Sequence, residues 1–280
     1  MSSSTSGPGT WAALILLLAL VAALFYPAVR VLAQVCSDDP NNSHIFLVPL
    51  ISAYLAWQRR EELAALPLAT SGRGLGVFAA GLGLYLLGHL SRIQALCNLA
   101  LATTAIGLVW FNLGGRVWRT LRFPLLFLFF LVPPPGSLVK FATFPLQLFA
   151  TKVSAATLKL LAIPVLREGN MLYFAHTQLE VAEACSGIRS MMAFLMLGVL
   201  FAYLTRGGKG RRLLLVALAV PLAIVMNIVR VTGTGVLAYL YDDRVARGFL
   251  HEFSGLLVFA AGFAVMAGLH LVLDRKAPRA

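Results

Sequence analysis

Long runs of apolar residues, separated by short polar segments, dominate the pattern of the chain. Several runs reach the roughly 18–20 residues that a helix needs to cross the hydrocarbon core of a bilayer. The pattern therefore predicts an all-α, polytopic membrane helix bundle that forms one domain over residues 1–280. We expect about eight transmembrane helices, at Trp11–Ala33, His44–Trp57, Gly74–Leu90, Leu96–Leu113, Phe123–Val132, Ala184–Leu204, Leu213–Leu240 and Phe249–Leu273.

The composition agrees with a membrane protein. Of the 280 residues, 59% are hydrophobic and 12% are charged, which is too little polar surface for a soluble domain of this length. A net charge of +12 would indicate nucleic-acid binding in a soluble protein, but here the basic residues lie in short loops between apolar runs. The three cysteines are widely scattered, and we find no zinc spacing or glycine-rich phosphate loop. We therefore expect no metal, no cofactor and no nucleic-acid partner.

The distribution of basic residues predicts the orientation of the chain in the membrane. Every second connection between apolar runs is rich in arginine or lysine, and cytoplasmic loops carry such an excess. Both termini are then cytoplasmic. The basic residues of the predicted cytoplasmic segments are Arg59, Arg60, Arg73, Arg116, Arg119, Arg122, Arg206, Lys209, Arg211, Arg212, Arg275, Lys276 and Arg279.

Residues 138–183 are predicted to lie outside the cytoplasm, between the fifth and sixth spans. Lysines recur among apolar residues in the first half, which is typical of helices that lie in the membrane interface. The letters "MLYF" and "QLEVA" resemble two short strands, so we expect a small β-hairpin before the sixth span. The alternative is a hairpin of two further spans. Cys36 and Cys97 both fall near the outer face, where a disulfide between them is an open alternative.

Three chemically reactive side chains are predicted near the outer face of the membrane. Cys185 opens the sixth span, Arg230 lies deep in the seventh toward its outer end, and His251 lies at the outer start of the eighth. An ionisable group within a spanning helix is costly, and its presence indicates a function. Because the three groups share one depth on three consecutive helices, we expect them to meet.

Together these groups suit acyl transfer. A helix N-terminus favours the thiolate of Cys185 and disfavours the imidazolium of His251, which leaves the imidazole available as a base. Arg230 would stabilise an oxyanion or clamp a substrate carboxylate. Taken singly, each residue has a structural alternative: the cysteine as a small apolar filler, the arginine as the partner of a carboxylate, and the histidine as an interfacial anchor.

Five further residues are candidates for binding substrate or supporting the site. Arg189 follows the cysteine by one helical turn, and Asn227 precedes the arginine by three residues. Glu183 and Ser186 flank the cysteine, and His44 opens the second span. An ion pair between Arg189 and Glu183, and a helix-capping role for His44, are the alternatives.

The motifs around these residues resemble those of the exosortase/archaeosortase family along most of the chain. "VAEACSGIRS" is similar to the cysteine motif of the family, "NIVRVTGTG" to its arginine motif and "HEFSGLLVF" to its histidine motif. "DPNNSHIFLVPLISAYLAW" is similar to its early outer loop and second span, and "RFPLLFLFFLVPPP" to its fifth span. The resemblance implies a catalytic set of Cys185, Arg230 and His251. Archaeal relatives tend to have arginine in place of His251, so the bacterial exosortase branch fits better.

The resemblance also implies a substrate and a location. The enzyme would be a cysteine transpeptidase or endopeptidase of the inner membrane, with its active site on the extracytoplasmic side. It would cleave a C-terminal sorting tail of the PEP-CTERM kind: a short motif often resembling Pro-Glu-Pro, a spanning helix and a basic cluster. The exported protein would pass to an unknown acceptor at the cell surface, with an exopolysaccharide-linked group as one option.

Two alternative functions remain open at the level of the sequence. An intramembrane cysteine protease that hydrolyses without transfer would form the same acyl-enzyme. A transporter with Arg230 on an anion path is disfavoured, because its ionisable groups would lie at several depths through the bilayer.

Overall fold

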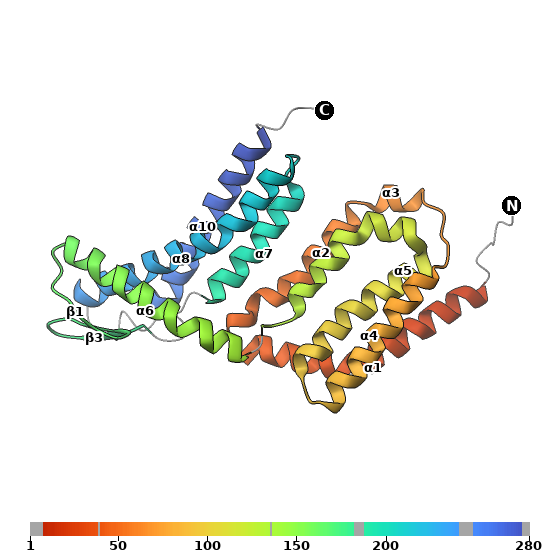
Figure 1. Ribbon diagram of the computed structural model, residues 1–280, viewed down its shortest axis with the longest axis horizontal. Coiled ribbons are helices and arrows are strands. Elements are labelled where there is room, and N and C mark those ends of the chain that lie inside the picture. The colour runs from red at the N-terminus through yellow and green to blue at the C-terminus, as the bar shows by residue number, and fades with distance from the viewer. Residues whose placement is uncertain (1–7, 39, 135, 182–187, 241–248, 276–280) are drawn as a thin grey trace. The chain divides into compact units, whose positions relative to one another are not determined.

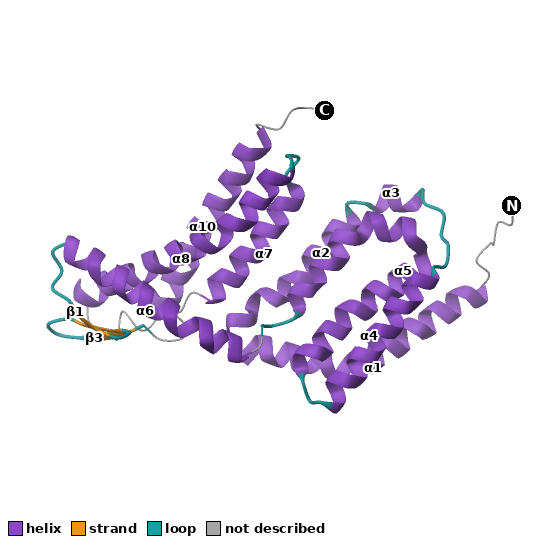
Figure 2. Cartoon of the chain, viewed as in Figure 1, coloured by secondary structure: helices purple, strands orange, loops and turns teal. Residues whose placement is uncertain are grey.

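The computed structural model describes residues 8–38, 40–134, 136–181, 188–240 and 249–275. The chain forms two compact units, Met1–Pro133 and Pro134–Ala280, built almost wholly of helices with one small sheet (Figures 1 and 2). The first unit contains α1 (Pro8–Asp38), η1 (Pro40–Phe46), α2 (Leu47–Trp57), α3 (Arg60–Ala64), α4 (Gly72–Leu90), α5 (Gln94–Phe127) and η2 (Leu128–Leu131). The second contains α6 (Gly136–Leu160), β1 (Leu166–Glu168), β2 (Met171–Tyr173), β3 (Gln178–Glu180), α7 (Ile188–Leu204), α8 (Lys209–Leu240) and α10 (Phe249–Arg275).

The all-α polytopic membrane fold is confirmed, whereas the count of eight spans stays a prediction. Among the described residues, five helical segments are long and apolar enough to cross a membrane, and Ser190–Leu204 is a shorter apolar helix. α2 has 11 residues and therefore a length of about 16 Å, roughly half the thickness of the hydrocarbon core. The prediction of a single domain likewise stays a prediction.

Glycines allow α4 and α5 to pack closely as an antiparallel pair. A Cβ atom added to Gly81 would lie 2.7 Å from the backbone nitrogen of Thr104, and one added to Gly88 would lie 2.9 Å from that of Cys97. Neither position tolerates a side chain at this separation. This close approach of backbones is typical of membrane helices, where dispersion contacts replace the hydrophobic effect between helices.

The predicted fourth and fifth spans are separated by a sharp break at Gly114 and not by the longer loop that we expected. α5 runs from Gln94 to Phe127 and bends at Gly114, whose φ of 90° and ψ of 174° lie outside helical values. Only glycine adopts such a φ at low cost, so the chain changes direction here without a separate loop. Arg116, Arg119 and Arg122, which we expected in that loop, lie in the helix after the bend.

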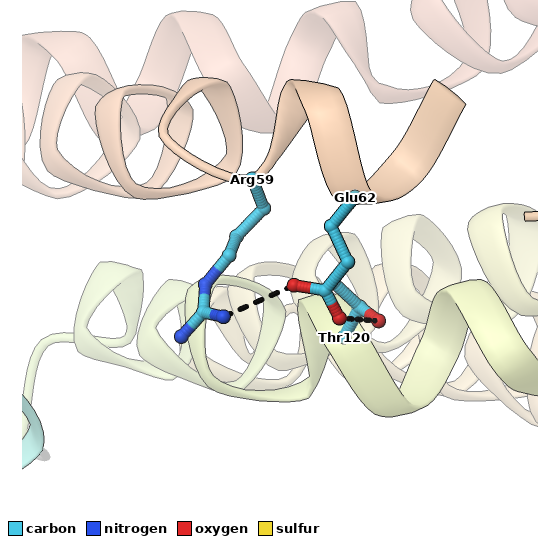
Figure 3. A network of polar contacts seen from close by, with 3 residues as sticks. All are labelled: Arg59, Glu62 and Thr120. Atoms are coloured by element: carbon cyan, nitrogen blue, oxygen red, sulfur yellow. Dashed lines mark hydrogen bonds and ion pairs between the residues drawn. The ribbon is translucent and has the colours of Figure 1, made fainter. Parts of the chain in front are cut away.

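Polar contacts hold the second half of α5 to α2 and α3. The hydroxyl of Ser52 donates a hydrogen bond to the carbonyl of Pro124 at 2.9 Å. At the surface, Glu62 pairs with Arg59 at 3.0 Å and accepts a hydrogen bond from Thr120 at 3.0 Å (Figure 3). These contacts lie in the first unit and fix its short helices.

The proposed disulfide between Cys36 and Cys97 is absent. Both residues are buried and neither forms a disulfide. Cys97 packs in a core cluster with Phe25, Tyr85 and Ala100 and so acts as a small apolar side chain.

Helix α8 is the centre of the second unit, with α6, α7 and α10 packed around it. One end of this bundle is held by hydrogen bonds between the α7–α8 connection and the end of α10. The hydroxyl of Thr205 and Nδ1 of His270 are 2.8 Å apart, and the backbone N–H of Arg206 donates to Asp274 at 2.6 Å. The opposite end therefore carries the start of α7, the end of α8 and the start of α10.

The segment after the first unit differs in part from the predicted interfacial helices and hairpin. It contains one continuous helix, α6, followed by three antiparallel strands in the order β1-β2-β3. The expected pair β2–β3 is confirmed. β1 was missed because "LRE" is only three residues long and carries two charges. A single helix followed by a sheet excludes the alternative of two spans, whereas the interfacial location stays a prediction.

The sheet is anchored by a hydrophobic core cluster that joins α6, the strands and α8. Leu158 of α6, Leu172 of β2 and Val231 of α8 belong to this cluster, together with Ala155, Ile163, Val165, Leu179 and Val181. Leu158 and Leu172 are fully buried. The sheet thus packs on the face of α8 that carries Val231, the residue after Arg230.

Candidate active site

The residues expected to form the site fall into three groups. Cys185, Glu183 and Ser186 lie within residues 182–187, outside the described part of the chain. Arg189 and His251 belong to helices α7 and α10, but their side chains are likewise outside the description. The geometry therefore rests on α8 and on the elements that pack around it.

Arg230 lies in α8, ten residues before the helix ends at Leu240, and is half-buried. Asn227 and Thr234 are each 4% exposed and lie one turn before and after the arginine. The hydroxyl of Thr234 donates a hydrogen bond to the carbonyl of Arg230 at 3.0 Å. Asn227, Arg230 and Thr234 thus form a polar stripe along an otherwise apolar helix.

The guanidinium of Arg230 lies beside α10 at Gly255. A Cβ atom added to Gly255 would lie 3.4 Å from Cζ and from Nη2 of Arg230, and 3.5 Å from Nε. His251 is four residues before Gly255, and residues at this spacing share one face of a helix. The face of α10 that contacts Arg230 is therefore the face on which position 251 lies.

The register of α7 against α8 places Arg230 near the level at which α7 begins. A Cβ atom added to Gly198 of α7 would lie 2.9 Å from Cβ of Ala219 and 3.2 Å from the carbonyl oxygen of Leu215. Ile188, the first residue of α7, is ten residues before Gly198 and so about 15 Å along the helix. Because the two helices are antiparallel, Ile188 is level with about residues 225–229 of α8.

The chain is held at both ends of the segment that contains the cysteine. Val181 is 1% exposed and shares the core cluster of Val231, the residue after Arg230. The backbone N–H of Val181 donates to the carbonyl of Asn170 at 3.0 Å, which fixes Val181 beside the sheet. Cys185 is four residues after Val181 and three before Ile188, so chain length limits it to about 14 Å and 11 Å from their respective Cα atoms.

Two features of this site were not foreseen from the sequence. The contact of Gly255 with the arginine was missed, although a glycine four residues after a candidate histidine was a usable signal. The anchoring of Val181 to α8 joins residues far apart in the chain and has no local signal.

His44 belongs to the first unit. It is 6% exposed and lies in η1, which packs against α1 and α2. Its contact with substrate stays a prediction.

Comparison with known protein families identifies a match. A family model described as transmembrane exosortase matches residues 33–268, which include every candidate site residue. No curated protein and no solved structure matches the chain.

Proposed function

The chain belongs to the transmembrane exosortase family, and on this premise we propose that it is a cysteine transpeptidase that cleaves a C-terminal sorting tail and transfers the exported protein to an acceptor. Membership establishes a membrane protein-sorting enzyme, in a family of cysteine peptidases and transpeptidases that act on exported proteins with C-terminal sorting signals. The residues, the reaction steps and the acceptor are parts of the proposal.

The reaction begins with Cys185 as nucleophile. The imidazole of His251 takes the proton of the Cys185 thiol, and the resulting thiolate attacks the carbonyl carbon of the scissile peptide. The guanidinium of Arg230 stabilises the negative oxygen of the tetrahedral intermediate. The C–N bond breaks, His251 delivers a proton to the departing amine, and a thioester remains on the cysteine. An acceptor amine or hydroxyl then attacks the thioester, gives its proton to His251, and releases the thiolate.

The observation that carries the proposal is the placement of Arg230. Its guanidinium contacts the face of α10 that holds position 251, and it lies near the level at which α7 begins. The two ends of the cysteine segment, Val181 and Ile188, lie near the same stretch of α8, and chain length limits how far position 185 can lie from it. An arginine with a purely structural role would not need to lie close both to the face that holds position 251 and to the level at which α7 begins.

The alternative is hydrolysis without transfer. What supports transfer is that α6 and the sheet cover the face of α8 that carries Val231, the residue after Arg230, and so reduce the access of water to this turn of the helix. Water exclusion favours an acceptor nucleophile over hydrolysis. Family membership removes the reason to consider a transporter. The active site lies on the extracytoplasmic side in this proposal, because the positive-inside rule places the opposite end of α7, α8 and α10 in the cytoplasm.

Substitution of the cysteine tests the proposal. A reporter protein ending in a Pro-Glu-Pro motif, an apolar helix and a basic cluster should be processed by the enzyme and left uncleaved by Cys185→Ala, at equal amounts of membrane-inserted enzyme. The matched controls are Cys36→Ala and Cys97→Ala, which should process normally because these buried thiols lie in the first unit. Processing by Cys185→Ala at the normal rate would disprove the nucleophile assignment.

Mass spectrometry of the new C-terminus separates the two reactions. A C-terminus joined to an acceptor supports transfer. A free carboxylate on every cleaved molecule would replace transfer by hydrolysis.

A further inference from the structure

We propose that Gly255 is a positioning residue for Arg230: because it has no side chain, the guanidinium can lie beside α10 one helical turn from position 251. The inference rests on the proposed role of the arginine, and it assigns a function to a glycine that the reaction itself does not use. It concerns α8 and α10 of the second unit only.

The guanidinium group lies over the position at which a side chain on residue 255 would begin. Three atoms of Arg230, namely Nε, Cζ and Nη2, lie 3.4–3.5 Å from the position that a Cβ atom on Gly255 would occupy. This separation is an ordinary van der Waals contact, so a single methyl group would just touch the arginine. A branched side chain extends beyond Cβ into the same space and would overlap the guanidinium.

The helix cannot easily move aside instead of the arginine. About two turns beyond Gly255, a Cβ atom on Gly262 would lie 3.0 Å from Cγ of Met226. Further along the helix, Met266 is fully buried in the cluster with Phe194 and Ala219. Close packing along α10 therefore holds the helix against α7 and α8. A larger residue at position 255 would displace the guanidinium.

Such a displacement would affect the chemical step. His251 lies one turn before Gly255, so the contact at Gly255 sets how far the arginine lies from the turn that carries the base. A shift of about 1 Å in a catalytic group can lower a rate by roughly 100-fold. Gly255 thus acts through the arginine and not on the substrate.

The first experiment compares three variants of the full-length enzyme by processing of the same reporter. Gly255→Val should lower kcat by about 10- to 100-fold, and Gly255→Ala should stay within about threefold of the unsubstituted enzyme. Gly268→Val is the matched control, because Gly268 lies on the same helix with nothing within 4 Å of an added Cβ atom. An equal kcat for Gly255→Val and Gly268→Val would overturn the proposal.

A second experiment does not depend on activity. Thermal unfolding in detergent is measured for Gly255→Val, Arg230→Ala and the double variant, which together form a double-mutant cycle. Gly255→Val should lower the unfolding temperature in the presence of the arginine and have little effect in its absence. An equal decrease in both backgrounds would show that valine clashes elsewhere, and the proposal would fall.

A failure of the positioning role of Gly255 can be distinguished from a failure of the proposed catalytic role of Arg230. Normal processing by Arg230→Ala would reject the catalytic role of the arginine, whereas the unfolding cycle would still report on the contact. If Gly255→Val alone does not insert and fold, recovery of folded protein in the double variant supports the contact. If the double variant also fails to insert and fold, the result argues against the contact between Gly255 and Arg230.

Discussion

The anchor formed by the small sheet leads to a quantitative prediction for Leu172→Ala. Leu172 lies in the central strand β2, pairs with Leu179 of β3, and is fully buried in the cluster that contains Val231 of α8. Truncation of a fully buried leucine costs about 2–5 kcal/mol, since it removes apolar contact and leaves a cavity. A cost of about 3 kcal/mol corresponds to a roughly 150-fold larger equilibrium constant for detachment of the sheet.

Amide hydrogen exchange of the strands measures this detachment directly. Exchange of the amides in β2 and β3 should accelerate by about two orders of magnitude, because these amides exchange through local opening. Processing of the reporter should fall at the same time, since Val181 would no longer hold the chain that leads to Cys185. The spanning helices should keep their protection.

The control lies in the same sheet. Leu166 of β1 is 59% exposed, so Leu166→Ala should leave both exchange and processing almost unchanged. If the two variants exchange at the same rate, the sheet is not held by its buried face and the anchoring argument is wrong.

Three shorter predictions concern α8, α4 and α3. Arg230→Lys should lower processing almost as much as Arg230→Ala, because a lysine lacks the planar fork, and a normal rate would mean that charge alone is sufficient. Gly81→Leu should lower the thermal unfolding temperature of the detergent-solubilised protein, because the added Cβ would lie 2.7 Å from the backbone of Thr104. Gly83→Leu is the control and should not lower it, because an added Cβ at Gly83 points into open space. Equal unfolding temperatures for the two variants would contradict the packing of α4 on α5. Glu62→Gln should change that temperature little, since its ion pair is exposed and screened by solvent, and a large decrease would show that the contact matters more than its exposure indicates.

Much of the fold follows from local patterns in the sequence. The helices around the third, seventh and eighth predicted spans end within a few residues of their expected bounds, because apolar length and turn residues act locally. The arginine at position 230 stands out for the same reason, since a charge in an apolar helix is costly wherever the helix packs. The strand pair β2–β3 could also be predicted from the sequence, because the strand-like residues and the turn residues between them lie within a few positions of each other.

Tertiary structure alone decided how these parts meet. The break at Gly114 depends on a backbone conformation that glycine permits but does not require, so the sequence alone could not show that the two helical segments of α5 meet there without a loop. Arg230 lies beside Gly255, and Val181 shares a core cluster with Val231. The residues of each pair are distant in the chain. Such pairs are selected by close packing between helices and sheet, and hydrophobic periodicity specifies which face is buried but not which residue it meets.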